Sequence, residues 1–182
     1  MGKYAQVYTR IWYDKAFNTL SIPYRFFFLY ALSSPHSNMI GYYKLPLMYI
    51  MSDLGWNHGQ AEGAVKDREL AHFLAYDPAA EMILVRKYLK YNQITNDKQK
   101  TGAIRILEEL PKSSLHPLFL ECIKLYAPKY GAAFEALGDE FWKPTDTLPI
   151  PIRYPINTLP IGDPTVTVTV TERSSCPRSL PR

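Results

Sequence analysis

Between residues 45 and 90, apolar residues follow helical spacing in two successive stretches and then form two short apolar runs. The first stretch predicts a helix that begins at Leu45-Pro46, because proline suits the first helical position, where an N–H would have no intrahelical partner. Gly55 predicts its end, since glycine often follows the last residue of a helix. The apolar positions at helical spacing are Leu47, Ile50, Met51 and Leu54.

The second stretch predicts a helix over residues 57–71, capped by Asn57, with Ala61, Ala64 and Val65 on its apolar face. Arg68 stands where this spacing requires an apolar residue. Strands are predicted at 73–76 and 82–86, with a turn at Asp77-Pro78. A helix–turn–helix followed by a β-hairpin is the arrangement of a winged helix, which commonly reads DNA.

The pattern elsewhere is mainly helical. Residues 3–12 alternate loosely and predict a strand or an extended arm, and residues 39–44 predict a short strand that pairs with the hairpin. Residues 22–32 are apolar nearly all round, which indicates a buried helix with Ser21 as its N-cap. Further helical segments are predicted at 14–20, 98–110, 115–125 and 132–141.

This pattern predicts a mainly α fold with a small β-hairpin. It divides the chain into a winged-helix domain at 1–111, a helical extension at 112–142 and a disordered tail at 143–182. The tail holds eight of the 15 prolines and repeats the sequence Thr-Leu-Pro-Ile at 147–150 and 158–161. Such a proline-dense segment cannot pair its backbone regularly or bury enough surface to fold.

Positive charge is concentrated just after the predicted hairpin. The whole chain has a net charge of only +4, with 47% apolar and 14% aromatic residues. Residues 84–105 contain six basic residues and one acid, whereas residues 106–142 contain three basic residues and six acids. The excess of positive charge in residues 84–105 points to a polyanionic partner more clearly than the net charge of the whole chain does.

No enzyme, metal centre or cofactor site is expected from the motifs. The four histidines lack metal-ligand spacing, and no glycine-rich phosphate loop is present. Cys122 lies on an apolar helical face, which predicts an inert buried thiol, and Cys176 is far away in the tail. The N-terminus does not resemble a signal peptide, and the longest apolar run, 26–32, is too short to span a bilayer. A cytoplasmic protein with no membrane partner is therefore expected.

Two groups of residues are candidates for contact with double-stranded DNA. In helix–turn–helix proteins the early residues of the second helix meet base edges, and Asn and Gln can pair with adenine. An alternative is that these are solvent-facing residues of an ordinary helix. The candidate base-facing residues are Asn57, His58 and Gln60, followed by Lys66; the candidate phosphate contacts are Arg86, Lys87, Lys90, Lys98 and Lys100. The interleaved Tyr88 and Tyr91 could stack on unpaired bases or pack in the core.

Several short motifs, in order, resemble phage-encoded replication-initiation proteins of the replisome-organiser type. The resemblance covers about residues 3 to 111 and rests on the order and spacing of the motifs. They are Tyr8-Thr9-Arg10-Ile11-Trp12, the run 25–36, Ile40-Gly41-Tyr42-Tyr43, Asp53-Leu54-Gly55-Trp56, the run 73–77, Leu89-Lys90-Tyr91-Asn92-Gln93-Ile94 and Lys98-Gln99. The resemblance implies an N-terminal winged helix that binds origin DNA and a remainder that helps recruit a helicase or helicase loader in a bacterial host.

The chain departs from that pattern at Arg68 and in the tail after Lys143, which lacks the second helical domain that many relatives have. The expected function is sequence-directed binding of double-stranded DNA in the initiation of phage or prophage replication. A winged-helix transcription regulator is one alternative, and a winged helix used only for protein contacts is another. The sequence leaves open whether the chain forms a homo-oligomer.

Overall fold

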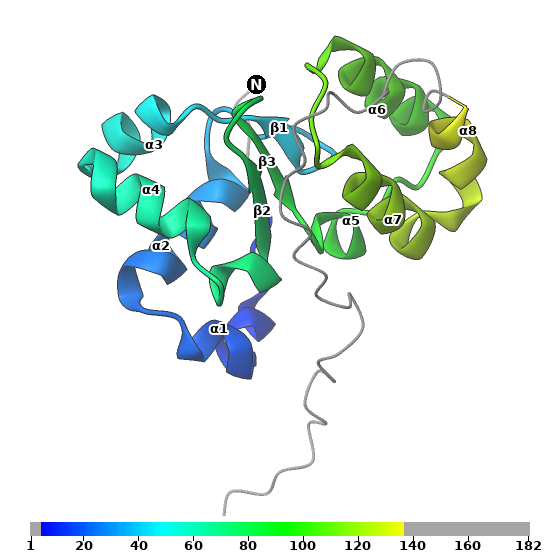
Figure 1. The fold of residues 1–182 in the computed structure, drawn as a ribbon. Coiled ribbons are helices and arrows are strands. Elements are labelled where there is room, and N and C mark those ends of the chain that lie inside the picture. The colour runs from blue at the N-terminus through cyan, green and yellow to red at the C-terminus, as the bar shows by residue number, and fades with distance from the viewer. Residues whose placement is uncertain (1–4, 137–182) are drawn as a thin grey trace, which may run out of the picture.

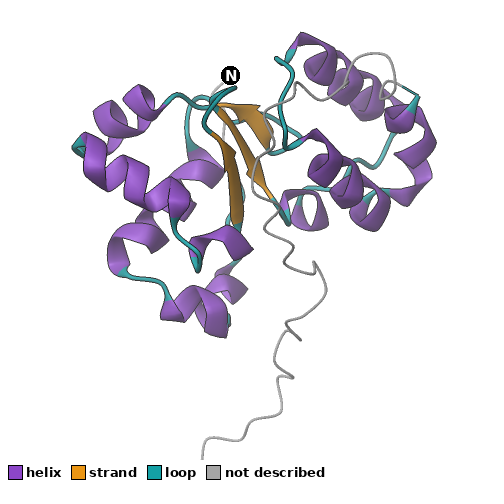
Figure 2. Cartoon of the chain, in the orientation of Figure 1, coloured by secondary structure: helices purple, strands orange, loops and turns teal. Residues whose placement is uncertain are grey.

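The computed structural model describes residues 5–136 as helices arranged around a small antiparallel sheet (Figures 1 and 2). None of the helices in this range is long and apolar enough to cross a membrane. The predicted disordered tail, 143–182, lies outside the described residues. In chain order the elements are η1 Thr9–Tyr13, α1 Lys15–Thr19, α2 Ile22–Ser33, β1 Tyr42–Lys44, α3 Leu47–Leu54, α4 His58–Lys66, η2 Leu70–His72, β2 Leu74–Asp77, β3 Met82–Val85, α5 Tyr88–Tyr91, α6 Asp97–Glu109, α7 His116–Tyr126, η3 Pro128–Tyr130 and α8 Gly131–Glu135.

The sheet has the strand order β1-β3-β2, and both neighbours run antiparallel to the central strand. Ile83 in β3 is paired with Tyr43 on one side and with Tyr76 on the other. The predicted hairpin and the predicted pairing of the earlier strand with it are therefore confirmed. The strand boundaries shift by one to three residues.

Helices cover both faces of this sheet. Side chains alternate between the faces of a strand, and in β3 the residues Ile83 and Val85 belong to one core cluster while Met82 and Leu84 belong to another. In Figure 1, α1 to α4 lie on one side of the sheet and α5 to α8 on the other. This explains why every residue of β3 is buried.

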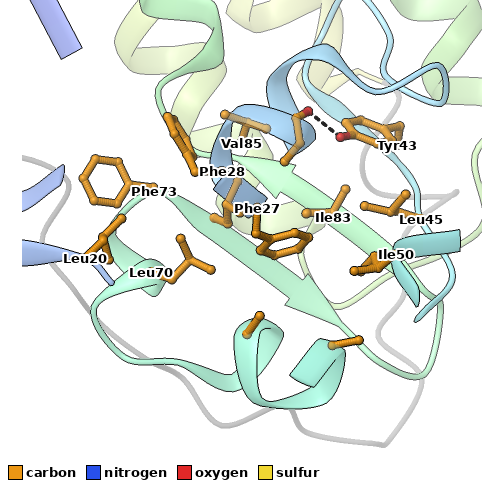
Figure 3. Packing of buried hydrophobic residues seen from close by; sticks show 14 of the residues in the cluster. Leu20, Phe27, Phe28, Tyr43, Leu45, Ile50, Leu70, Phe73, Ile83 and Val85 are labelled. Atoms are coloured by element: carbon orange, nitrogen blue, oxygen red, sulfur yellow. Dashed lines mark hydrogen bonds between the residues drawn. The ribbon is translucent and has the colours of Figure 1, made fainter. Parts of the chain in front are cut away.

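The first core combines aromatic residues, among them Phe27, Phe28 and Tyr43, with aliphatic residues from the helices and the sheet (Figure 3). Phe27 and Phe28 of α2 pack with Leu70, and the rings of Phe28 and Phe73 are 5.1 Å apart. The buried Tyr43 hydroxyl donates a hydrogen bond of 2.5 Å to the Ala31 carbonyl. Only one side of α2 is buried: Phe26 is 55% exposed, so the prediction of a helix buried all round was wrong.

The helix pair α3–α4 forms for the local reasons that the sequence indicated. Gly55 ends α3 in the left-handed conformation with φ of 65°, which glycine adopts without steric cost. Asn57 caps α4 in a capping box with Gln60. Pro46 is the residue before α3 rather than its first residue.

One predicted boundary and one predicted element type were wrong. Helix α4 ends at Lys66 rather than Ala71, because the Asp67 carboxylate accepts a hydrogen bond from the Leu70 amide and starts the separate turn η2. Arg68 consequently lies in an exposed turn, and the buried residue of this segment is Leu70. Helical spacing does not apply to Arg68, because the helix has already ended. Nearer the N-terminus, residues 9–13 of the predicted strand or arm form the 3-10 helix η1.

The second core joins the two segments that the sequence divided at residue 111. Ala103 and Leu107 of α6 share a cluster with Phe119 and Ile123 of α7 and with the sheet. The helices predicted at 98–110 and 115–125 are confirmed to within one residue. The start of the helix predicted at 132–141 corresponds to α8, and residues 137–141 lie outside the described residues. Cys122 is buried as predicted, and burial raises the pKa of its thiol to about 12.

Candidate nucleic-acid interface

Helix α4 presents its polar side to solvent, but part of that side is used to cap the helix. The Gln60 amide donates a 2.9 Å bond to Asn57 Oδ1, and the Asn57 amide donates a 2.9 Å bond to Gln60 Oε1. Bidentate recognition of adenine uses both the oxygen and the NH₂ group of such a side chain. Base reading by Asn57 or Gln60 would therefore compete with the cap.

The charged residues of α4 neutralise one another. Lys66 Nζ lies 2.5 Å from Glu62 Oε1, and His58 Nδ1 lies 3.8 Å from Glu62 Oε2. The hydrogen bond from Lys66 holds the pKa of the Glu62 carboxyl below its usual value. Lys66 therefore adds little net positive charge to this face of the molecule.

Two glycines lie on the exposed side of α4. A Cβ atom at Gly59 would meet only the Asn57 side chain at 3.5 Å, and one at Gly63 only the Tyr24 hydroxyl at 3.9 Å. Glycine within a helix costs about 0.5–1 kcal/mol relative to alanine. Packing inside the chain does not require either glycine, and together they leave the backbone of α4 accessible to a ligand.

The five predicted phosphate contacts differ in accessibility. Arg86 is only 7% exposed and directly follows the fully buried strand β3, so it is less accessible to a phosphate than the four predicted lysines. Lys100 Nζ is 3.3 Å from Asp97 Oδ1 and lies over the Tyr130 ring. Within residues 5–136, no ion pair involves Lys87, Lys90 or Lys98.

The nine predicted DNA contacts do not lie on one surface. Helix α4 is on one side of the sheet and the start of α6, with Lys98 and Lys100, is on the other (Figure 1). The hairpin turn, residues 78–81, and Lys87 lie at opposite ends of β3. The turn itself has no basic residue, and its Glu81 lies 3.5 Å from Lys44. The predicted contacts therefore fall into separate groups. One group lies on the exposed face of α4, and the basic residues around Lys87 lie at the end of β3 opposite the hairpin turn.

Three exposed cationic residues that were not predicted as DNA contacts lie close to α4 or to Lys87. Arg68 follows α4 directly, and its mismatch with the helical spacing was the only signal. Arg10 and Lys15 lie near the N-terminus and line a cleft together with Lys87. No sequence signal connected them, because residues 10 and 87 are brought together only by the fold.

No group of histidine, cysteine or acidic side chains within residues 5–136 could hold a metal ion. Comparison of the chain with protein-family models, curated proteins and solved structures found no match in any of the three.

Proposed function

We propose that this chain binds double-stranded DNA as a winged-helix protein, with α4 in the major groove. The observation that carries the proposal is the order β1, α3, α4, β2, β3, in which a tightly turned helix pair leads into a hairpin that pairs back with the preceding strand. In helix–turn–helix proteins the second helix of the pair enters the major groove.

The exposed side of α4 fits that role. His58, Gly59, Gly63 and Lys66 are all exposed, and the two glycines leave room for close approach to the helix backbone. Arg68 stands directly after the helix and forms no ion pair within residues 5–136. It is a better candidate for a phosphate contact beside α4 than the buried Arg86, since phosphate contacts need an accessible cation.

The biological setting that we propose is initiation of phage or prophage DNA replication in the cytoplasm of a bacterial host, with a helicase or helicase loader as a protein partner. This setting is supported by the motif resemblance over residues 3–111. A transcription regulator would use the same DNA-binding surface. A helicase-loader gene beside this one would favour replication, whereas a divergent promoter would favour regulation.

A charged substitution on α4 tests the proposal. Gly63→Glu places a carboxylate on the exposed helix face, where it would meet the phosphates and edges of a bound duplex. We expect affinity for duplex DNA from the neighbourhood of the gene to fall by about tenfold or more, because like charges at an interface are strongly unfavourable. Mobility-shift titration at low salt measures the change.

Thr101→Glu is the matched control, since it adds the same charge to an exposed position of α6, beyond the sheet. It should retain duplex binding. Equal loss in both variants would indicate a general charge effect and contradict the assignment to α4. Absence of duplex binding by the unmodified chain at low salt, together with co-purification of a helicase loader, would favour a winged helix used only for protein contacts.

A further inference from the structure

A cleft of about 380 Å³ lies between the N-terminal segment and the end of β3 that leads into α5. Residues of the segment 6–16 form one wall, and Lys87, Tyr88 and Tyr91 form the other. Its floor is the edge of the first core, provided by Phe28, Phe73 and Val85. In Figure 1, β3 leads into α5 at the lower end of the sheet, and α1 lies at the same end.

Aromatic rings line this cleft. Tyr13 is 84% exposed, and Tyr8 and Tyr91 are also exposed. The Tyr8 and Tyr91 rings are 5.3 Å apart at 41°, and the Tyr8 hydroxyl donates a 3.3 Å hydrogen bond to the Tyr91 carbonyl. This contact joins the two walls. A large ring as exposed as Tyr13 keeps apolar surface in water that a stacked partner would cover.

The charged residues of the cleft are mainly cations. Arg10, Lys15 and Lys87 line it, and the only acid among the lining residues is Asp14. The Asp14 carboxylate already accepts hydrogen bonds from the Ala16 and Phe17 amides at the start of α1.

These cations also lack the close carboxylate partner that some of the other basic residues have. Lys44, Lys66, Lys100 and Lys124 are each within 4.0 Å of a carboxylate. Nowhere in residues 5–136 does Arg10, Lys15 or Lys87 form such a pair. The cleft therefore combines an apolar floor and aromatic rims with uncompensated positive charge.

We infer that this cleft binds single-stranded DNA, with unpaired bases against the tyrosine rings and the backbone phosphates beside Arg10, Lys15 and Lys87. Aromatic faces next to a cationic groove are the combination by which proteins hold unpaired strands without reading a sequence. Bases of a duplex are stacked within the helix and cannot enter such a cleft. The inference is thus independent of the duplex contact proposed for α4.

Fluorescence anisotropy of the full chain with a labelled short oligo(dT) tests the inference. Tyr13→Ala should weaken binding by about tenfold, since one lost base–aromatic stack has roughly that effect. The double variant Arg10→Ala, Lys87→Ala should reduce the slope of log K against log salt by about 1.4, because each phosphate contact on a single strand contributes about 0.7.

The controls are an exposed aromatic and an exposed cation elsewhere, Tyr49→Ala in α3 and Lys112→Ala in the loop before α7. Both should bind oligo(dT) as the unmodified chain does. Gly63→Glu should also leave oligo(dT) binding unchanged, so failure of the duplex proposal and failure of this one can be told apart. Unaltered circular dichroism spectra verify that each variant is folded.

Three results would overturn the inference. The first is no binding of oligo(dT) at low salt. The second is equal affinity in Tyr13→Ala and Tyr49→Ala. The third is competition by oligo(rU) or by thymidine monophosphate at least as strong as competition by unlabelled oligo(dT), which would assign the cleft to RNA or to a free nucleotide.

Discussion

At the scale of single residues, Gly41 has the least freedom to change. Its φ of 65° is left-handed, and a Cβ atom built there would lie 2.3 Å from Cγ of Tyr88. The Gly41 carbonyl also accepts a hydrogen bond of 2.8 Å from the Val85 amide. The absence of a side chain at residue 41 thus allows Tyr88 to pack beside the end of β3, where it lines the cleft.

Substitution of two glycines by alanine separates backbone strain from crowding. Gly55 has the same φ but nothing within 4 Å of a Cβ position. We expect Gly55→Ala to lower the free energy of unfolding by about 1 kcal/mol, from strain alone. Gly41→Ala should lower it by about 3 kcal/mol, because overpacking against Tyr88 adds to the strain. Urea unfolding measures both values, and equal losses would contradict the role given to Tyr88.

At the scale of elements, local signals predicted where helices α3 and α4 begin and end only when the capping residues were unambiguous. Gly55 and Asn57 act in the structure as the sequence indicated. The end of α4 was missed because residue 67 was placed inside the predicted helix, whereas the Asp67 carboxylate accepts a hydrogen bond from the Leu70 amide in the following turn. Residues 82–85 are apolar at every position, a pattern that is compatible with burial on both faces of a sheet.

Apart from the pairing of β1 with the hairpin, long-range contacts between elements could not be predicted from the sequence. The Asp77 carboxylate accepts hydrogen bonds of 2.7 to 2.8 Å from the Ser113 and Ser114 side chains and from the Ser114 amide. It also accepts bonds from the Ala79 and Ala80 amides in the hairpin turn. Asp77 therefore ties the hairpin to the segment before α7, 36 residues later in the chain. Similarly, only the fold places Lys87 beside Arg10 in one cleft.

Asp77 makes the stability of this tie dependent on pH. Burial raises the pKa of Asp77, but the hydrogen bonds from Ser113, Ser114 and Ala80 outweigh that effect and hold the pKa below its usual value. The charged form therefore stabilises the fold above about pH 4, the unfolded value, and this stabilisation is lost as the pH falls through the folded value. Asp77→Asn should reduce the free energy of unfolding by about 2 kcal/mol at neutral pH.

Urea unfolding of the unmodified chain and of Asp77→Asn between about pH 7 and pH 2 measures this dependence. The difference between the two proteins should be constant down to about pH 4 and then shrink. A difference that stays the same at low pH would mean that the charge of Asp77 does not contribute.

At the scale of the whole molecule, the sheet needs both helical layers. Tyr42 and Phe119 stack with ring centroids 5.1 Å apart, and Phe119 is fully buried in the second core. A chain cut at residue 111, where the sequence predicted a domain boundary, would keep α5 and α6 but remove the α7 residues that pack with Ile40, Tyr42, Met82 and Leu84. A winged helix with a separate extension would tolerate that cut, whereas a sheet covered on both faces would not.

We therefore expect residues 1–111 alone to show no cooperative unfolding transition in urea, while the full chain shows one. Within the full chain, Phe119→Ala should lower the free energy of unfolding by about 3–5 kcal/mol, because it leaves a cavity under the sheet. Leu118→Ala, at a half-buried position one residue earlier, should cost clearly less. A fragment 1–111 that unfolds as cooperatively as the full chain would restore the boundary at 111, and α7 would then be an addition to a sheet that is stable without it.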